Sequence, residues 1–139
     1  MKAKSFHCSK NGLAAQIAAE IGTKLQCVSD KMPPAYPSDA EKVVYIGIEM
    51  DGKVPLPVEQ FCKDLNPART KNVAFYIING KGNTQGLEAV IANLKKNGVN
   101  TIPEILPITV KTSLFNKGKL TDADIKKALD WAVKISLMP

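Results

Sequence analysis

The apolar and polar positions of the chain divide it into short strand-like segments and longer amphipathic ones. The short segments are rich in β-branched and apolar residues, whereas the longer ones repeat apolar residues at three- or four-residue intervals, which is typical of helices. The expected strands are Ser5–Cys8, Lys24–Ser29, Val43–Ile48, Val73–Ile78 and Thr101–Val110. The expected helices are Leu13–Ile21, Pro55–Leu65, Thr84–Asn97 and Thr121–Leu137.

The order of these segments predicts the fold class. Strands that alternate with helices indicate parallel pairing with right-handed crossovers. Val43–Ile48 and Val73–Ile78 are continuously apolar, as expected for central strands buried on both faces, whereas Pro103 and Pro107 confine the last strand to an edge. We therefore expect a single domain over residues 1–139, an α/β three-layer α/β/α sandwich whose five-stranded parallel sheet has the order 2-1-3-4-5.

The connecting segments contain several local signals. Gly22 is expected to end the first helix, and Thr121 to cap the last one. Ser38–Glu41 has a capping-box pattern and is expected to form one helical turn within the Pro-rich connector 30–41. Residues 111–119 are expected to form a loop. Trp131 lies beside the apolar stripe of the last helix, so we expect it at the rim of the core.

Three loops are expected to meet at the carboxyl end of the sheet, where the winding reverses and ligands usually bind. They are Ser9–Leu13, Glu49–Lys53 and Asn79–Asn83. The first joins a strand to a helix N-terminus, where unpaired backbone N–H groups and the positive end of the helix dipole favour an anion. The sequence therefore predicts a phosphate site in that loop.

Composition and charge narrow the range of partners. Apolar residues make up 45% of the 139 residues, and no apolar run approaches the roughly 20 residues that span a bilayer, so we expect no membrane insertion and no leader segment. The net charge is +6, but Arg69 is the single arginine and the lysines are spread along the chain. Such a distribution predicts a solvated surface rather than a nucleic-acid site, and leaves an acidic protein partner possible.

The cysteines and the one histidine do not form a recognisable catalytic or metal motif. Cys8, Cys27 and Cys62 lack metal-ligand spacing, so we expect reduced thiols, no metal and a cytoplasmic location. Cys8 at the end of a strand could act as a nucleophile, but a C-x5-R phosphatase motif would need arginine at Ala14. A buried structural thiol is the preferred interpretation, as is a hydrogen-bonded neutral side chain for His7.

Several motifs resemble those of flavodoxins over nearly the whole chain. Ser9–Ala14, SKNGLA, is similar to the family's phosphate loop, commonly SKTGNT. Gly52–Pro55 keeps the G-K-x-P pattern after the third strand. Asn72–Gly82 resembles the fourth strand with its loop, and Phe115–Val133 resembles the last loop and helix. Here Asn11 and Ala14 replace residues that supply hydroxyl groups to the phosphate, and the flanking loops lack aromatic residues.

The resemblance implies an FMN-binding electron-transfer protein with a redox-partner protein. The residues implied to hold the phosphate are Ser9, Lys10, Asn11, Gly12, Leu13 and Ala14. Those implied to lie beside the flavin ring and its pyrimidine edge are Met50, Asp51, Gly52, Asn79, Gly80 and Lys81. The alternative hypothesis is a flavodoxin-fold domain that has lost FMN and acts as a binding or regulatory module.

Overall fold

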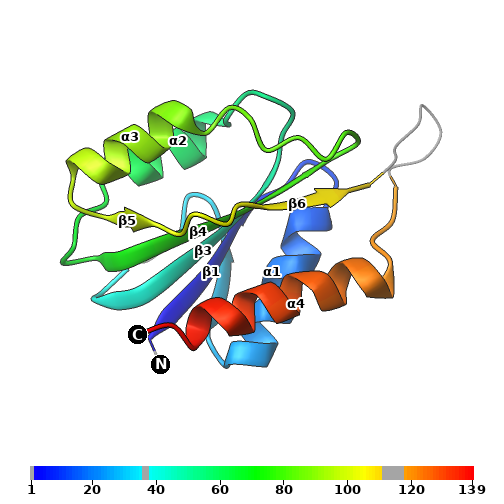
Figure 1. Ribbon diagram of the computed structural model, residues 1–139, viewed down its shortest axis with the longest axis horizontal. Helices are drawn as coiled ribbons and strands as arrows, with labels where there is room; N and C mark the ends of the chain where they lie inside the picture. The colour runs from blue at the N-terminus through cyan, green and yellow to red at the C-terminus, as the bar shows by residue number, and fades with distance from the viewer. Residues whose placement is uncertain (1, 36–37, 111–117) are drawn as a thin grey trace.

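One parallel sheet lies between two pairs of helices in the computed structural model, which describes residues 2–35, 38–110 and 118–139 (Figure 1). Its strands are β1 (Ala3–Cys8), β2 (Val28–Lys31), β3 (Glu41–Glu49), β4 (Thr70–Asn79), β5 (Asn100–Thr101) and β6 (Leu106–Thr109). Its helices are α1 (Leu13–Leu25), α2 (Leu56–Lys63), α3 (Glu88–Lys96) and α4 (Asp122–Ser136).

The strand order confirms the predicted 2-1-3-4-5 arrangement, with the fifth position divided between two short strands. The sheet runs β2-β1-β3-β4, and both β5 and β6 pair with β4 in parallel. Thr101 lies opposite Val73, and Leu106 lies opposite Tyr76. The interruption contains Pro103, whose ring nitrogen cannot donate to a strand ladder, so the edge strand breaks there.

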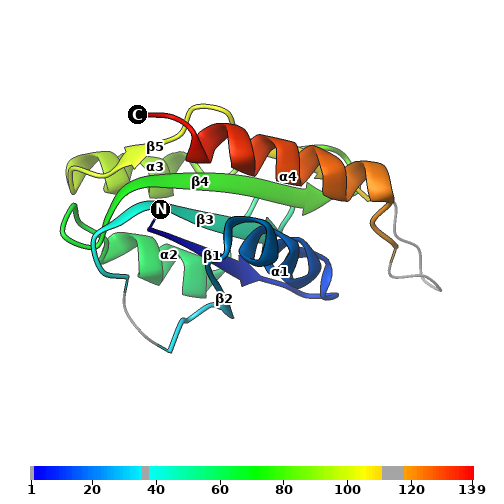
Figure 2. The ribbon, with the colours of Figure 1, turned by 90° about the horizontal axis from the view of Figure 1, so that it is seen from below.

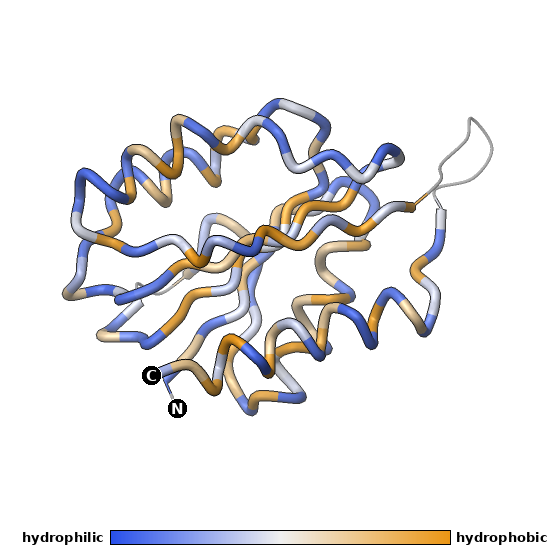
Figure 3. Tube along the Cα trace, viewed as in Figure 1, coloured by the Kyte–Doolittle hydropathy of each residue, from blue (hydrophilic) through white to orange (hydrophobic). Residues whose placement is uncertain are grey.

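Each face of the sheet is covered by one helix pair (Figure 2). The core between the sheet and α1 with α4 includes Tyr45 and Tyr76, and the core on the α2 and α3 side includes Ile46 and Phe75. Successive side chains of β3 and β4 point to opposite faces of the sheet and therefore pack alternately into the two cores. The central strands are apolar in their middle parts, whereas polar residues gather on the outer faces of the helices (Figure 3). Among the described residues, no helix combines the length and the apolar character needed to cross a membrane.

Several element boundaries differ from the sequence-based expectations. Gly22 does not end α1, which continues to Leu25 and moves the second strand to Val28–Lys31. A Cβ atom on Gly22 would lie 3.0 Å from the Cys27 carbonyl oxygen, so the residue serves close packing rather than termination. The helical turn predicted at Ser38–Glu41 is wrong, because Glu41 already begins β3. The third helix begins at Glu88 rather than Thr84, and most of the loop expected at 111–119 lies outside the described residues.

Helix α4 is anchored by an N-terminal cap and by a buried tryptophan. Thr121 and Asp124 form the predicted capping box. Trp131 is only 3% exposed, with its ring 5.7 Å from Tyr45 and 5.8 Å from Tyr76, so the prediction of a rim position is wrong. Its Nε1 donates to the Glu104 carbonyl at 3.1 Å, and Lys127 Nζ donates to the Pro107 carbonyl at 3.1 Å. Helix α4 is thereby fixed against the edge of the sheet.

Candidate functional site

The loop between β1 and α1 folds as a cradle of backbone N–H groups. Gly12 takes a φ of +80° just before the helix, a conformation that suits glycine. Ser9 Oγ accepts a hydrogen bond from the Ala15 amide at 2.9 Å and so satisfies one donor of the first helical turn. This arrangement gathers the remaining amides at the positive end of the α1 dipole, as the sequence predicted for an anion site.

The anion that these amides bind is a side chain of the protein itself. The Glu49 carboxylate, at the end of β3, accepts hydrogen bonds from the amides of Lys10 at 3.1 Å, Asn11 at 3.0 Å and Ala14 at 3.2 Å. Glu49 is only 6% exposed. We call these three hydrogen bonds the Glu49 bridge. A carboxylate bound by several backbone N–H groups at a helix N-terminus is strongly favoured, because both the hydrogen bonds and the dipole stabilise its charge.

The bridge opposes the binding of a phosphate group at the same amides. Two unit negative charges about 4 Å apart repel each other by roughly 4 kcal/mol at an effective dielectric constant of 20, and a phosphate dianion carries two such charges. The side chains of Asn11 and Ala14 offer no hydroxyl groups in compensation. The residues present therefore do not fit the phosphate of FMN while Glu49 holds this position.

Tyr76, on the neighbouring strand β4, also holds the first turn of α1. The Tyr76 hydroxyl donates to the Ala14 carbonyl at 3.3 Å, on the same residue whose amide donates to Glu49. The Tyr76 ring fills the space above Gly47, where a Cβ atom would lie 2.0 Å from the tyrosine Cζ. Burial, and secondarily the Glu49 charge, raise the pKa of Tyr76 above its ordinary value, so the hydroxyl remains a donor.

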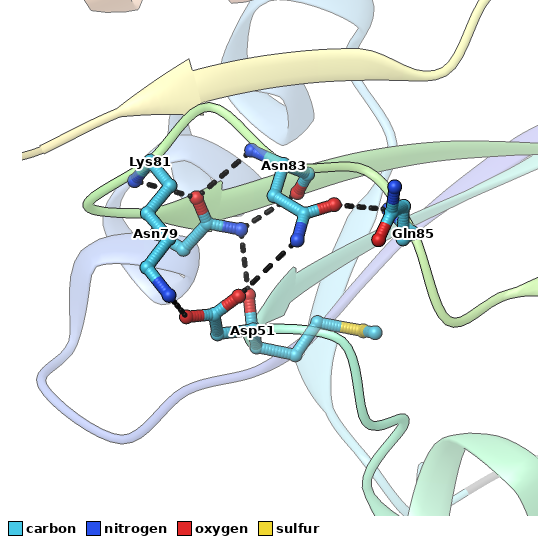
Figure 4. A network of polar contacts seen from close by, with 6 residues as sticks. Asp51, Asn79, Lys81, Asn83 and Gln85 are labelled. Atoms are coloured by element: carbon cyan, nitrogen blue, oxygen red, sulfur yellow. Dashed lines mark hydrogen bonds and ion pairs between the residues drawn. The ribbon is translucent and has the colours of Figure 1, made fainter.

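The loops that follow β3 and β4 are joined by a second set of polar contacts, which we call the loop network (Figure 4). It consists of Asp51, Asn79, Lys81 and Asn83. Asn79 Nδ2 donates to the carbonyls of Met50 at 2.9 Å and Asn83 at 2.6 Å, and its Oδ1 accepts from the amides of Lys81 and Asn83. Asp51 receives Asn83 Nδ2 at 3.3 Å and forms an ion pair with Lys81 at 3.3 Å.

The same two loops also touch through their backbones. Gly86 has a φ of +105°, and a Cβ atom there would lie 2.6 Å from the Gly52 carbonyl oxygen and 2.9 Å from the Met50 Cε. Together with the loop network, this contact draws the segment after β3 against the segment after β4. The two loops that the sequence resemblance placed around a flavin ring are therefore in direct contact with each other.

A cavity of about 150 Å³ remains among the three loops. Seven of the predicted site residues line it, namely Lys10, Asn11, Leu13, Met50, Asp51, Asn79 and Gly80. The volume is below the roughly 300–1,000 Å³ of sites for drug-sized ligands. Ser9, Gly12, Gly52 and Lys81 belong to the same loops and Ala14 to the first turn of α1, but none of these five lines the cavity. The structure thus brings the predicted residues together at one end of the sheet, around a space smaller than such ligands usually occupy.

Glu49 is the residue that the sequence-based site prediction missed. The available signal was an acidic residue directly after the apolar run 43–48, at the carboxyl end of a central strand where ligands usually bind. Cys8 lies near the same carboxylate. Burial and the Glu49 charge raise the pKa of the Cys8 thiol, which is the opposite of what a nucleophilic cysteine needs.

The fold can now be compared with known structures. The crystal structure of oxidised Flavodoxin 2 from Bacillus cereus superposes with a TM-score of 0.69 at 20% identity, and the match covers 98% of both chains. A flavodoxin from the domain Archaea superposes with a TM-score of 0.70 at 18% identity, covering 98% of this chain and 99% of the other. The fold is that of a flavodoxin. At the level of sequence, no family model matches the chain, and no curated protein matches it.

The flavodoxin fold explains why the three loops meet, and the side chains on these loops form the Glu49 bridge and the loop network. Because β1, β3 and β4 are adjacent and parallel, the segments after their last residues must lie at one end of the sheet. What those segments bind is decided by the side chains on them. Here an acidic side chain occupies the anion cradle, and asparagine and aspartate join the two neighbouring loops.

Proposed function

We propose that this chain is a flavodoxin-fold binding module that works without FMN. The observation that carries the proposal is the Glu49 bridge, because three amides of the β1–α1 loop already bind a carboxylate. The contact between the loops after β3 and β4, and the small cavity that they enclose, support it independently. The net charge of +6 favours an acidic protein surface as the partner.

A second candidate function, FMN-dependent electron transfer, is favoured by the likeness to two flavodoxins over 98% of the chain. In that case the phosphate would have to displace Glu49 from the amides of Lys10, Asn11 and Ala14. The flavin would supply the redox chemistry, while Met50, Asp51 and Asn79 would line its site. The two candidates therefore differ in whether the Glu49 bridge yields to the cofactor.

The deciding experiment is an FMN titration of the purified protein, followed by flavin fluorescence and visible absorbance. We expect a colourless protein and no saturable quenching of FMN fluorescence at micromolar concentrations. Quenching with a micromolar or lower Kd, or yellow protein as isolated, would contradict the proposal and support electron transfer.

A pair of engineered variants separates the contributions of the bridge and of the missing hydroxyls. The double variant Asn11→Thr/Ala14→Thr restores hydroxyl groups but keeps Glu49, so we expect it to leave FMN affinity almost unchanged. Adding Glu49→Ala removes the charge repulsion, and we expect FMN affinity to rise by at least about tenfold over the double variant. An equal gain without the Glu49 substitution would mean that the bridge does not exclude FMN.

A further inference from the structure

We propose that the amino end of the sheet, opposite the candidate site, is the surface on which the partner docks, and that this partner presents an acidic protein segment. The inference rests on the proposed function, in which the chain is a binding module for an acidic protein. It adds which end of the molecule that protein contacts and which residues receive its carboxylates.

The amino end of the sheet carries the positive charge of the chain. The strands begin at this end and the helices finish there, as the starts of β3 and β4 and the ends of α3 and α4 show (Figure 1). Nine basic and three acidic residues lie there, a net charge of +6, whereas the other ten basic and ten acidic residues cancel. Lys134 is counted with the remainder, because it is ion-paired with Glu104. The basic residues at this end are Lys2, Lys4, Lys24, Lys42, Lys63, Arg69, Lys71, Lys95 and Lys96, and the acidic ones are Asp39, Glu41 and Asp64.

The helix dipoles account for only part of this charge. Four of the nine cations lie in the last turns of α1, α2 and α3, where a positive side chain compensates the negative end of the helix dipole. The other five lie at the starts of strands or directly before them, where no helix dipole calls for a cation. In the part of the chain that the structure describes, none of the nine forms an ion pair with a carboxylate. Their charge is therefore available to an external anion.

A hollow of about 450 Å³ lies among these strand starts. Lys2, directly before β1, Lys42 in β3 and Lys71 in β4 line it, and these three strands are adjacent in the sheet. Lys2 Nζ donates to the Asp39 carbonyl at 2.8 Å, and Lys42 Nζ donates to the Ser136 carbonyl at 2.9 Å. Backbone oxygens thus position two ammonium groups without neutralising them, and each keeps donors for a carboxylate.

Glu41 also lines the hollow but opposes an entering carboxylate only weakly. It is 5% exposed, and its Oε1 accepts the Asp39 amide at 3.2 Å. Three lysines therefore face one covered carboxylate, so the net charge of the hollow is positive. A hollow of this charge suits the side chain of an aspartate or a glutamate from another protein.

The chemistry of this end favours the carboxylates of a protein over nucleic acid or a membrane. Eight of the nine cations are lysines, whereas the planar fork of arginine is the better match for phosphate. No described residue in the lining of the hollow is aromatic, so a base has no ring on which to stack. Leu137 and Met138 are exposed and directly follow Ser136, which binds Lys42. An apolar strip beside a charged hollow resembles the core and rim of a protein interface more than a flat surface for lipid headgroups.

The test uses a fluorescein-labelled oligoglutamate peptide as the probe, with its anisotropy measured at low ionic strength. The double variant Lys2→Glu/Lys71→Glu reverses two charges at the hollow. Lys31→Glu/Lys53→Glu is the matched control, because it reverses two exposed lysines away from this end with the same change in net charge. We expect the first variant to bind the peptide at least about tenfold more weakly than the wild-type protein, and the control to lose less than about threefold. An equal loss in both would overturn the inference.

Backbone ¹⁵N–¹H spectra of the wild-type protein locate the probe without any substitution. We expect saturable shifts at the amides of Lys42, Lys71 and Gly98, and none at those of Asn11 and Asn79. Shifts confined to the last two would overturn the inference. Tighter binding of single-stranded DNA, or of phosphatidylcholine vesicles that contain phosphatidylserine, than of the peptide would overturn the choice of an acidic protein. The FMN titration is independent of these results, because FMN binding would refute the proposed function without moving the peptide from the opposite end of the sheet.

Discussion

Glu49 and Asp51 are acidic residues two positions apart at the end of β3, yet they lie in opposite environments. Glu49 is 6% exposed and accepts three backbone amides from the β1–α1 loop. The Asp51 side chain is 47% exposed, and its partners are the side chains of Lys81 and Asn83. The difference shows that one carboxylate can hold the backbone of a loop in place, while its neighbour makes only exposed side-chain contacts. Substitutions at Glu49 and Asp51 test this contrast directly, and substitutions at Asn79 and His7 test the contacts around these two residues.

The largest effect is expected from Glu49→Ala, which should lower the free energy of unfolding by about 2–4 kcal/mol. The substitution removes three charge-assisted hydrogen bonds and leaves the amides of Lys10, Asn11 and Ala14 without their acceptor. Urea unfolding followed by the fluorescence of Trp131 measures it. Glu20→Ala, which removes an exposed carboxylate from α1, is the control, and its free energy of unfolding should stay within about 0.5 kcal/mol of that of the wild-type protein. An equal loss in both variants would mean that the hydrogen bonds of Glu49 contribute no more to stability than an exposed carboxylate does.

Asn79→Ala should have an intermediate effect, a loss of about 1–2 kcal/mol. Asn79 is half-buried and joins the two loops through two donated and two accepted hydrogen bonds. Hydrogen exchange should also quicken at the amides of Lys81 and Asn83, which lose their acceptor. Unchanged exchange at both amides would show that the backbone contact at Gly86 alone holds the loops together.

Asp51→Asn should change the free energy of unfolding by less than about 0.5 kcal/mol, because exposed ion pairs contribute little. Its ion pair with Lys81 has side-chain exposures of 47% and 74%. Any loss should shrink as salt is added, since salt screens exposed charges. Urea unfolding at low and high ionic strength gives both values. A loss as large as that of Glu49→Ala would break the contrast between the two carboxylates.

The smallest effect concerns His7, the only histidine of the chain. Burial lowers the pKa of its imidazole below 6.5, although Asp30 and Glu49 partly oppose the shift. The unfolded chain therefore binds a proton before the folded one, so stability should fall as the pH drops through about 6.5 and rise again with pH. Urea unfolding between pH 5 and 7 tests this, and His7→Gln should abolish the slope that His7 contributes.

The sequence predicted the parts of the fold that depend on pattern. The continuous apolar runs at 43–48 and 73–78 identified the central strands, and Pro103 and Pro107 identified the edge. The positions that failed depend on packing between distant elements. Gly22 looked like a helix stop but lies close to Cys27, and Trp131 looked peripheral but packs between two tyrosines from adjacent strands.

The sequence predicted where the candidate site lies, but not which group occupies its anion cradle. The switch in winding direction located the three loops, and the strand-to-helix connection predicted an anion cradle. Which anion fills it depends on Glu49, whose acidic side chain after an apolar run was visible in the sequence. Its three hydrogen-bond donors lie 35 to 39 residues away along the chain, so the sequence did not show that it binds the β1–α1 loop. The contact between Gly86 and Gly52 is equally non-local, because it joins loops that follow different strands.

The two edges of the sheet, at β6 and at β2, differ in how they are protected from pairing with a strand of another molecule. At the β6 margin, the carbonyls of Glu104 and Pro107 are engaged by Trp131 and Lys127, so a foreign strand would have to compete with side chains of α4. At the opposite margin, β2 carries Val28 with 57% of its surface exposed. We therefore expect self-association of this protein, if concentrated or partly unfolded, to start by extension at β2 and to be suppressed by Val28→Lys.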